Sequence, residues 1–260
     1  MNKAKIIICA DDFGQNASIS AAICQLVQLQ RLNAVSCMVN GEAWLQYWPQ
    51  LLKNKSHIQI GLHLNLTHGQ GLTHTKLNAL GQFILQTYKL RPLSRVWLKT
   101  EIRAQIQKFK DDTGFWPQFI DGHQHVHQLP GVRDVLIECV REFQIKPWFR
   151  TTYHWHNQAL KHSGSWKKWA LLCLGGQSFY RLLQHQGWSV NHHFSGDYTF
   201  GREKSYRDIF LSAYRALPGE GVIMCHPGLN DEDEQDAIRH SRILEFQYFS
   251  SQQFADDLML

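Results

Sequence analysis

The sequence has few of the features that mark secreted, membrane or nucleic-acid-binding proteins. Its six cysteines are widely spaced and form no Cys-x-x-Cys pair, so we expect reduced cysteines in the core rather than a disulfide framework. No apolar run approaches the roughly 18 residues of a membrane-spanning helix. The apolar run before Asp11 is shorter than the core of a signal peptide, which has about 7 residues or more. These absences predict a cytoplasmic protein.

Charged residues are also few, and neither the basic nor the acidic ones are clustered in one part of the sequence. Charged residues make up 19% of the chain, with 27 Lys and Arg against 22 Asp and Glu. Because the basic residues are spread along the sequence, nucleic acid is not an expected partner. The 260 residues, 43% of them hydrophobic, are enough to bury a core without metal or disulfide staples. A bound metal is therefore expected to serve function.

Apolar runs and helical patterns alternate along the chain. Residues 6–10 are typical of a buried strand, and the apolar residues between Ile19 and Val27 have helical spacing, with Asn16 or Ser18 as the N-cap. Further strands are expected at 34–39, 58–66, 118–120, 147–150 and 221–225, and further helices around 98–109, 135–143 and 236–258. No repeat or linker is visible, so we predict an α/β fold: a single-domain variant (β/α) barrel, mostly parallel, over residues 1–260. Residues 67–92 and 154–200 are expected to be irregular.

Polar residues stand where these strands end. Asp11 and Asp12 follow the first strand, His63 lies in the third on the face opposite its apolar side chains, and Arg150 and His226 end two later strands. Active sites of parallel α/β folds lie at the carboxyl ends of the strands. One carboxylate and two imidazoles can form a facial set that leaves positions on a divalent ion open. Asp11 and Asp12 would face opposite ways in a strand, but a turn after the strand could bring both to the site.

The run Asp121-Gly-His-Gln-His-Val-His127 follows the 118–120 strand. If extended, its three histidines would share one face and could form a triple-His site. Leu129-Pro-Gly131 predicts a loop directly afterwards, so the alternation could instead break early and leave one imidazole for the metal. The sequence leaves both arrangements open.

Five motifs together resemble one known family. They are Ala10-Asp-Asp-Phe-Gly14, Val39-Asn-Gly41, Gly61-Leu-His-Leu-Asn-Leu-Thr67, the 121–127 run and Cys225-His-Pro-Gly228. In this order and spacing they are similar to the YdjC-like carbohydrate deacetylases, which include chitooligosaccharide deacetylase and hopanoid-associated deacetylases. The resemblance implies a variant (β/α) barrel, one divalent ion, Mg²⁺ or Zn²⁺, and hydrolysis of the N-acetyl group of an amino sugar.

The resemblance also implies roles for residues. Asp12, His63 and His123 would be the metal ligands, Asp11 the general base and His226 the acid, with the ion polarising the acetamide and activating water. Substrate contacts are expected from the neighbouring polar residues Asn65, His125, His127 and Arg150. Gln124 stands where chitooligosaccharide deacetylases tend to have another histidine, which leaves the sugar contacts open.

Two other functions remain open from the sequence. A metal-dependent phosphoester hydrolase could use the same ligands, with Arg150 as its phosphate-binding cation. A non-catalytic sugar- or metal-binding protein is the other, although the acidic and histidine residues expected of an enzyme are all present. A homodimer is compatible with either.

Residues 166–174, with the apolar positions that follow them, combine basic and apolar side chains. This composition fits a barrel helix that buries one face, and it also fits a helix resting on anionic lipid. Because hopanoid-associated members act on a lipid-linked sugar, the second alternative leaves peripheral lipid contact and a lipid-linked N-acetylglucosamine open.

Overall fold

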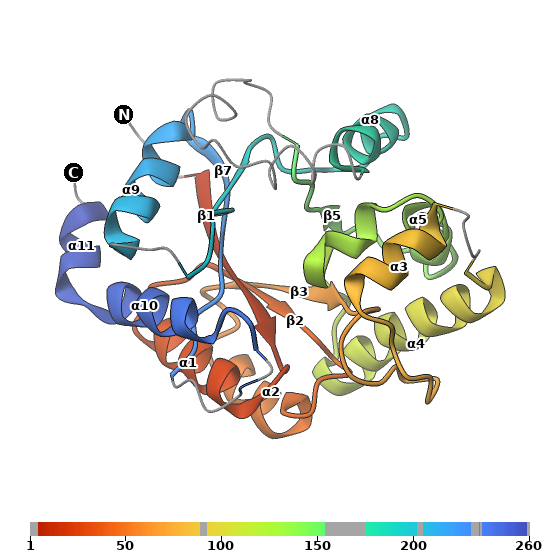
Figure 1. The fold of residues 1–260 in the computed structure, drawn as a ribbon, viewed down its shortest axis with the longest axis horizontal. Helices are drawn as coiled ribbons and strands as arrows, with labels where there is room; N and C mark the ends of the chain where they lie inside the picture. Colours follow the sequence, from red (N-terminus) through yellow and green to blue (C-terminus); the bar gives the residue numbers. More distant parts are fainter. Residues whose placement is uncertain are drawn as a thin grey trace.

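The computed structural model describes residues 5–88, 93–153, 175–201, 205–229, 234 and 236–258. The chain folds into one parallel sheet flanked by helices (Figure 1). Its strands are β1 (Lys5–Phe13), β2 (Ala34–Cys37), β3 (Gln59–Leu64), β4 (Phe119–Gly122), β5 (Trp148–Phe149), β6 (Phe194–Ser195) and β7 (Glu220–Cys225). The helices are α1 (Ala17–Gln28), α2 (Trp44–Leu52), α3 (Leu80–Thr87), α4 (Arg95–Thr113), α5 (Val132–Glu142), α8 (Gln177–His185), α9 (Tyr206–Ala216), α10 (Arg239–Ser250) and α11 (Gln252–Leu258), with a 3₁₀ segment η1 (His123–Gln128).

The sheet has seven strands in the order β5-β4-β3-β2-β1-β7-β6, and every pairing between them is parallel. The segment that enters β6 also touches the opposite edge, because Val190 forms a parallel bridge with Phe149 of β5. The Phe149 amide donates to the Ser189 carbonyl at 2.9 Å. The sheet therefore curls until its two edges meet, which confirms the variant (β/α) barrel expected from the sequence.

The helices pack on the outside of this sheet. Figure 1 shows α1, α2 and α10 gathered on one side of the molecule and α3, α4 and α5 on the other. In α1 the predicted face is buried, and the Asn16 side chain accepts from the Ile19 amide as the N-cap. In α4, Leu98, Ile102 and Ile106 are buried at the expected spacing. One apolar cluster extends from Ile6 to Phe254. The prediction of a single domain over residues 1–260 stays a prediction.

Several elements differ from the sequence-based expectations. The segment 67–92 is not irregular throughout, because it contains α3. Helices α2 and α9 were not expected, and β6 lies in a region expected to be irregular. Residues 166–174 lie outside the described residues. Within the described parts of the chain, no helix has the length and apolar character that a membrane crossing requires.

Candidate active site

The two adjacent aspartates reach the site through an irregularity in β1. Pairing with β2 shifts register between Ala10 and Phe13, and Asp12 has a left-handed backbone with φ of 66°. A register shift of this kind breaks the strict alternation of side chains along a strand. As a result Asp11 and Asp12 both approach the carboxyl end of the sheet. The expected turn after the strand is thus a bulge within it.

Two glycines allow the next loops to pack against this bulge. Gly14 has φ of 97°, and a Cβ placed on Gly41 would lie 2.1 Å from the Gly14 carbonyl oxygen. No larger residue fits that approach without moving the backbone. The glycines of the Asp-Phe-Gly and Asn-Gly motifs therefore fix the loops after β1 and β2 beside Asp12.

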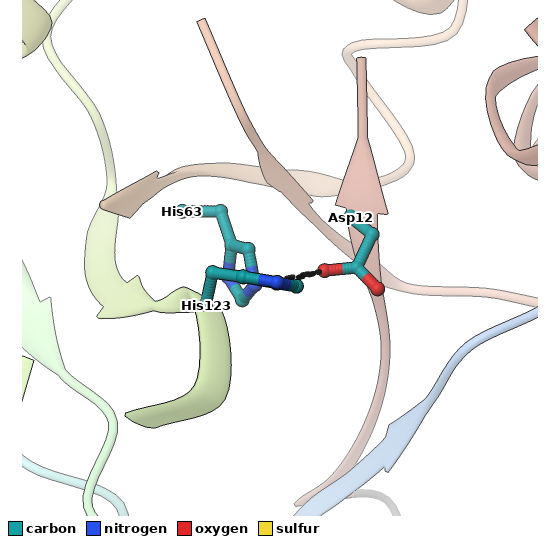
Figure 2. A group of neighbouring side chains, drawn as sticks. All are labelled: Asp12, His63 and His123. Carbon is teal, nitrogen blue, oxygen red and sulfur yellow. Dashed lines mark hydrogen bonds and ion pairs between the residues drawn. The ribbon is translucent and has the colours of Figure 1, made fainter. Parts of the chain in front are cut away.

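Asp12, His63 and His123 come together from β1, β3 and the start of η1 (Figure 2). The Asp12 Oδ1 atom lies 2.8 Å from His123 Nδ1 and 3.2 Å from His63 Nε2. One ligand atom from each of the three residues lies within 4.8 Å of the others. Asp12 and His63 are almost fully buried, whereas the His123 side chain is 12% exposed. The trio has the composition and spacing of a facial metal-binding set with one open side.

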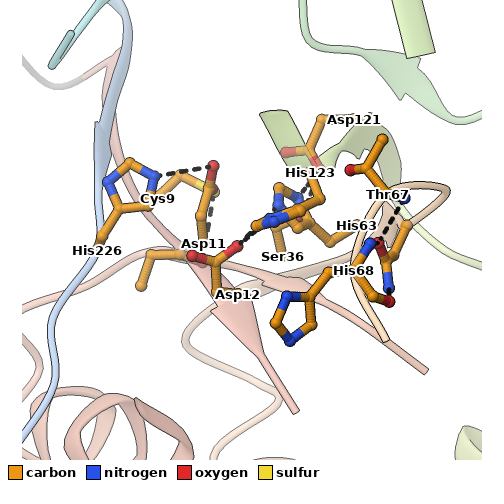
Figure 3. A network of polar contacts seen from close by, with 12 residues as sticks. Cys9, Asp11, Asp12, Ser36, His63, Thr67, His68, Asp121, His123 and His226 are labelled. Carbon is orange, nitrogen blue, oxygen red and sulfur yellow. Dashed lines mark hydrogen bonds and ion pairs between the residues drawn. The ribbon is translucent and has the colours of Figure 1, made fainter. Parts of the chain in front are cut away.

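Asp121 holds the imidazole of His63 from behind. Its Oδ1 atom lies 2.6 Å from His63 Nδ1 and also accepts a hydrogen bond from the Ser36 hydroxyl. A carboxylate on the far nitrogen fixes the ring and leaves Nε2 to face the other members of the trio, as in many metal sites. Figure 3 shows this chain of contacts running from Asp121 through the histidines to Asp12.

Arg242 of α10 holds the second oxygen of Asp12. Its NH2 group donates to Asp12 Oδ2 at 2.8 Å, and its Nε donates to Asp236 at 2.5 Å. Arg242 is only 3% exposed. Since Arg242 occupies Oδ2, Oδ1 is the oxygen that Asp12 directs at the two histidines.

The charges of this cluster favour a bound cation. Burial alone would lower the pKa of His63, but Asp121 and Asp11 outweigh it and raise that pKa to about 10. Burial alone would raise the pKa of Asp12, but His123 and Arg242 hold it well below its usual range. The carboxylates therefore hold a positive charge at His63 in the absence of an ion.

Asp11 has different surroundings from Asp12. Arg150 donates to both of its carboxylate oxygens, from NH1 at 2.7 Å and from NH2 at 2.6 Å. The same NH2 lies 3.0 Å from Asp121 Oδ2, so Arg150 links the two carboxylates. Arg150 has no exposed surface, and its ion pairs with these aspartates raise its pKa further despite the burial that opposes them. Its position supports Asp11 and does not support direct contact with substrate.

His226 follows β7 on the other side of Asp11. Its Nε2 atom lies 4.0 Å from Asp11 Oδ2, and its backbone amide donates to Glu245 of α10 at 2.5 Å. Burial lowers the pKa of His226 to about 4, despite the two nearby aspartates. Burial also raises the pKa of Glu245 to about 7. His226 is therefore neutral near pH 7 in the free protein.

The 121–127 run does not stay extended. Gln124 and His125 have φ of 52° and 60°, so the chain turns after His123 and only this histidine of the run joins Asp12 and His63. His127 is fully buried and its Nε2 lies 2.7 Å from the Arg150 carbonyl oxygen. His125 is 9% exposed, and its Nδ1 has no hydrogen-bond partner in the described structure. His127 is therefore committed to the backbone, whereas the substrate contact expected of His125 stays a prediction.

Asn65, expected to contact substrate, is instead committed to the protein. It is 1% exposed, its Oδ1 accepts from the Thr67 and His68 amides, and its Nδ2 donates to the His68 carbonyl and to Asn40 Oδ1. These four bonds use the full capacity of a primary amide. Asn65 therefore shapes the loop after β3.

Five further residues contact or support these side chains and were not expected from the sequence: Ser36, His68, Asp121, Arg242 and Glu245. Asp121 stood in a recognised motif and would have been found by asking what orients His63. Arg242 and Glu245 lie on a helix more than two hundred residues from Asp12, and no local pattern connects them with it.

Comparison with known proteins identifies the family of this chain. The family model described as YdjC-like protein matches residues 5–259. A carbohydrate deacetylase of Danio rerio is 33% identical over 156 residues, which cover 55% of this chain and 48% of that protein. A chitooligosaccharide deacetylase of Proteus mirabilis is 29% identical, covering 53% of this chain and 55% of that protein. The chain thus spans about half the length of these relatives.

Two further comparisons extend over nearly the full length. A carbohydrate deacetylase of Halalkalibacterium halodurans is 24% identical, covering 98% of this chain and 99% of that protein. A solved structure from Enterococcus faecalis, titled as a cellobiose-phosphate cleavage protein, superposes with a TM-score of 0.72 at 19% identity and covers 98% of this chain and 94% of that one. At that identity the structural likeness speaks for the fold alone. With the family match across residues 5–259, the chain belongs to the YdjC-like family.

Proposed function

We propose that this protein is a divalent-metal-dependent hydrolase that removes the N-acetyl group from an N-acetylated amino sugar. The observation that carries the proposal is the convergence of Asp12, His63 and His123 within 4.8 Å, beside a second carboxylate, Asp11, that is kept out of the trio by Arg150. The names of the relatives, carbohydrate deacetylase and chitooligosaccharide deacetylase, give the reaction class.

Asp12, His63 and His123 would hold the ion. Two imidazoles and one carboxylate suit Zn²⁺ better than Mg²⁺, which prefers oxygen ligands and stays the second ion expected from the sequence. The fit rests on the grouping of the three ligand atoms within 4.8 Å and on the Asp121 bond to the far nitrogen of His63, which leaves Nε2 for the ion. When bound, the ion supplies Lewis-acid polarisation of the acetamide carbonyl and lowers the pKa of a water molecule.

Asp11 takes the proton of the attacking water. The Arg150 bonds fix both carboxylate oxygens and orient the side chain. Oδ1 also accepts from the Cys9 thiol at 3.7 Å, so Oδ2 is the oxygen with a lone pair for the water. Because Asp121 shares Arg150, the same guanidinium ties the base to the support of His63. One arginine therefore sets the position of the base relative to the trio.

His226 delivers a proton to the leaving amine. Its pKa of about 4 means that it starts neutral near pH 7, so it must receive the proton during the reaction. The nearest source is the proton that Asp11 has taken, since Asp11 Oδ2 lies 4.0 Å from His226 Nε2. The two residues thus form a relay from water to amine.

The phosphoester alternative loses its main support, because Arg150 is fully buried and paired with Asp11 and Asp121. His125, with an unpartnered buried nitrogen, remains the proposed substrate contact from the predicted set. The lipid-linked substrate stays a hypothesis, since residues 166–174 lie outside the described part of the chain. A cytoplasmic location and a homodimer likewise stay predictions.

The test is acetate release by the purified protein from short chitin oligomers, N-acetylglucosamine conjugates and N-acetylglucosamine glycolipids. We expect turnover of at least one class, loss of activity after chelation, and recovery with Mg²⁺ or Zn²⁺. Phosphoester substrates should not be hydrolysed. Turnover that survives complete metal removal, or phosphatase activity with no acetate release, would contradict the proposal.

A further inference from the structure

A histidine outside the predicted set faces the metal-binding trio. His68 lies in the loop after β3, is exposed, and places its ring centroid 5.9 Å from that of His123 at an interplanar angle of 69° (Figure 3). His68 does not join the group of ligand atoms that lie within 4.8 Å of one another. It therefore stands at the rim of the site rather than among the ligands.

The loop that carries His68 is built to hold this residue in place. Asn65 accepts from the His68 amide at 3.0 Å and donates to its carbonyl at 2.8 Å. One buried side chain therefore hydrogen-bonds both backbone groups of His68. Gln105 of α4 in turn holds Asn65, accepting from its amide at 3.1 Å and donating to its carbonyl at 2.7 Å. Both supporting side chains are almost fully buried.

The continuation of the loop is anchored as firmly. Glu101 of α4 has no exposed surface and accepts from the Leu72 amide at 2.9 Å and from the Thr73 amide and hydroxyl at 2.9 and 2.8 Å. Asn40 donates to the Gln70 carbonyl at 3.1 Å. Asn65, Gln105 and Glu101 are buried side chains whose hydrogen bonds hold the backbone of this segment, and such bonds rigidify it. An exposed imidazole at the mouth of a site thus stands on a rigid support.

From this geometry we infer that His68 is a substrate-positioning residue, which binds the sugar that carries the acetamide, and that Asn65 acts on substrate only through His68. The inference rests on the proposed function and deepens it. An imidazole offers both a hydrogen-bonding nitrogen and a flat apolar face, so it suits a sugar hydroxyl and the ring behind it. Its position next to His123 places that contact beside the acetamide.

The first test is steady-state kinetics of His68→Ala on N,N′-diacetylchitobiose or on whichever acetylated sugar the wild type hydrolyses best. Loss of one hydrogen bond should raise KM by about 3- to 10-fold with kcat changed less than about 2-fold. Metal content should stay at the wild-type value. His68→Gln, which keeps a hydrogen-bonding group, should recover part of the loss. The control is His57→Ala, an exposed histidine at the entry to β3, at the opposite end of that strand.

The second test is a double-mutant cycle, which separates positioning from general stability. Asn65→Ala should raise KM in the wild-type background but add little in the His68→Ala background, because its effect travels through His68. A thermal melt of each variant checks that the fold is retained.

Three results would overturn the inference: unchanged kinetics in His68→Ala, loss of metal from His68→Ala, or fully additive effects of the two substitutions. If the wild type hydrolyses no acetylated sugar, the proposed function itself fails and the inference fails with it. That outcome is distinct from an active wild type with an equally active His68→Ala variant.

Discussion

Asp11 and Asp12 are neighbours in sequence, yet the protein gives them opposite surroundings. Asp12 contacts two imidazoles and one arginine that leaves Oδ1 directed at the histidines. Asp11 contacts Arg150 through both oxygens and lies beside His226. The left-handed backbone at Asp12 is what separates them, because it redirects the second side chain where a regular strand would have sent it to the opposite face.

The comparison teaches how one strand end can provide two functions. The Asp12 side gathers atoms suited to hold a cation, whereas the Asp11 side gathers groups suited to move a proton. Asp121 and Arg150 connect the two sides, since Asp121 supports His63 and shares Arg150 with Asp11. Substitutions on each side can show whether metal binding and proton transfer are lost separately.

The largest effect is expected on the Asp12 side. Asp12→Ala, His63→Ala and His123→Ala should each abolish acetate release, because a facial set that loses one of three protein ligands binds the ion too weakly. His125→Ala should be milder, since the chain turns away before it. The measurement is turnover at saturating substrate, with circular dichroism to check the fold. Activity within tenfold of wild type in any of the three would remove that residue from the ligand set.

On the Asp11 side the loss should be large but incomplete. Asp11→Asn keeps the shape of the side chain and removes the base, so kcat should fall by about two to four orders of magnitude. Asp111→Asn on the exposed surface of α4 is the matched control and should behave as wild type. Near-normal kcat in Asp11→Asn would mean that another group takes the proton of the water.

Removing the connection between the two sides should weaken metal binding. Asp121→Asn removes the carboxylate behind His63, and second-sphere changes of this kind lower metal affinity by about 10- to 100-fold. Ser36→Ala keeps that carboxylate and removes only the Ser36 hydroxyl, which contacts Asp121 and lies 3.0 Å from His63 Nδ1, so it should have a smaller effect. Calorimetric titration of the metal-free variants measures the dissociation constants. Equal constants for wild type and Asp121→Asn would separate Asp121 from the metal site.

The smallest effect concerns the helix behind His226. Burial raises the pKa of Glu245 to about 7 from its usual value near 4.5, so this group stabilises the folded state fully below about pH 4.5 and progressively less as pH rises through about 7. Glu245→Gln removes that titration. The stability of the variant relative to wild type should therefore rise between pH 4.5 and 7, by about 2 to 3 kcal/mol.

Urea unfolding of both proteins at several pH values measures this difference. The pKa of His226 is lowered to about 4, which makes its own contribution full above about pH 6.5 and lost as pH falls through 4. Because both proteins keep His226, that contribution cancels in the comparison. Glu42→Gln, the same substitution at an exposed position, is the matched control. A flat difference across the range would refute the raised pKa.

Much of the fold could be predicted from the sequence because its pattern is local. The apolar spacing of α1 and α4 and the buried runs of β1 and β7 are visible within a dozen residues of chain. Helix α9 was missed because its buried face is short, with Tyr206 and Phe210 one turn apart. Strand β6 has two residues, and it forms only because β7 lies beside it.

The site was predictable only in part, for a related reason. Strand ends predicted that Asp11, Asp12, His63 and the 121–127 run would lie together, since parallel strands bring their carboxyl ends to one edge. The family resemblance then singled out Asp12, His63 and His123. Hydrogen-bond saturation is invisible in a sequence, so Asn65 and Arg150 were expected to face substrate although both are buried supports. Arg242 approaches Asp12 across 230 residues of sequence, a contact that exists because β7, which precedes α10, pairs with β1.

The most direct test of the division between Asp11 and Asp12 is the metal content of one matched pair, Asp11→Asn and Asp12→Asn, purified identically and analysed by inductively coupled plasma mass spectrometry. The two variants make the same chemical change at adjacent positions. Asp11→Asn should retain close to one equivalent of the ion, and Asp12→Asn should retain almost none. Equal metal content in the two variants, whether both full or both empty, would contradict the assignment of one carboxylate to the ion and the other to the proton.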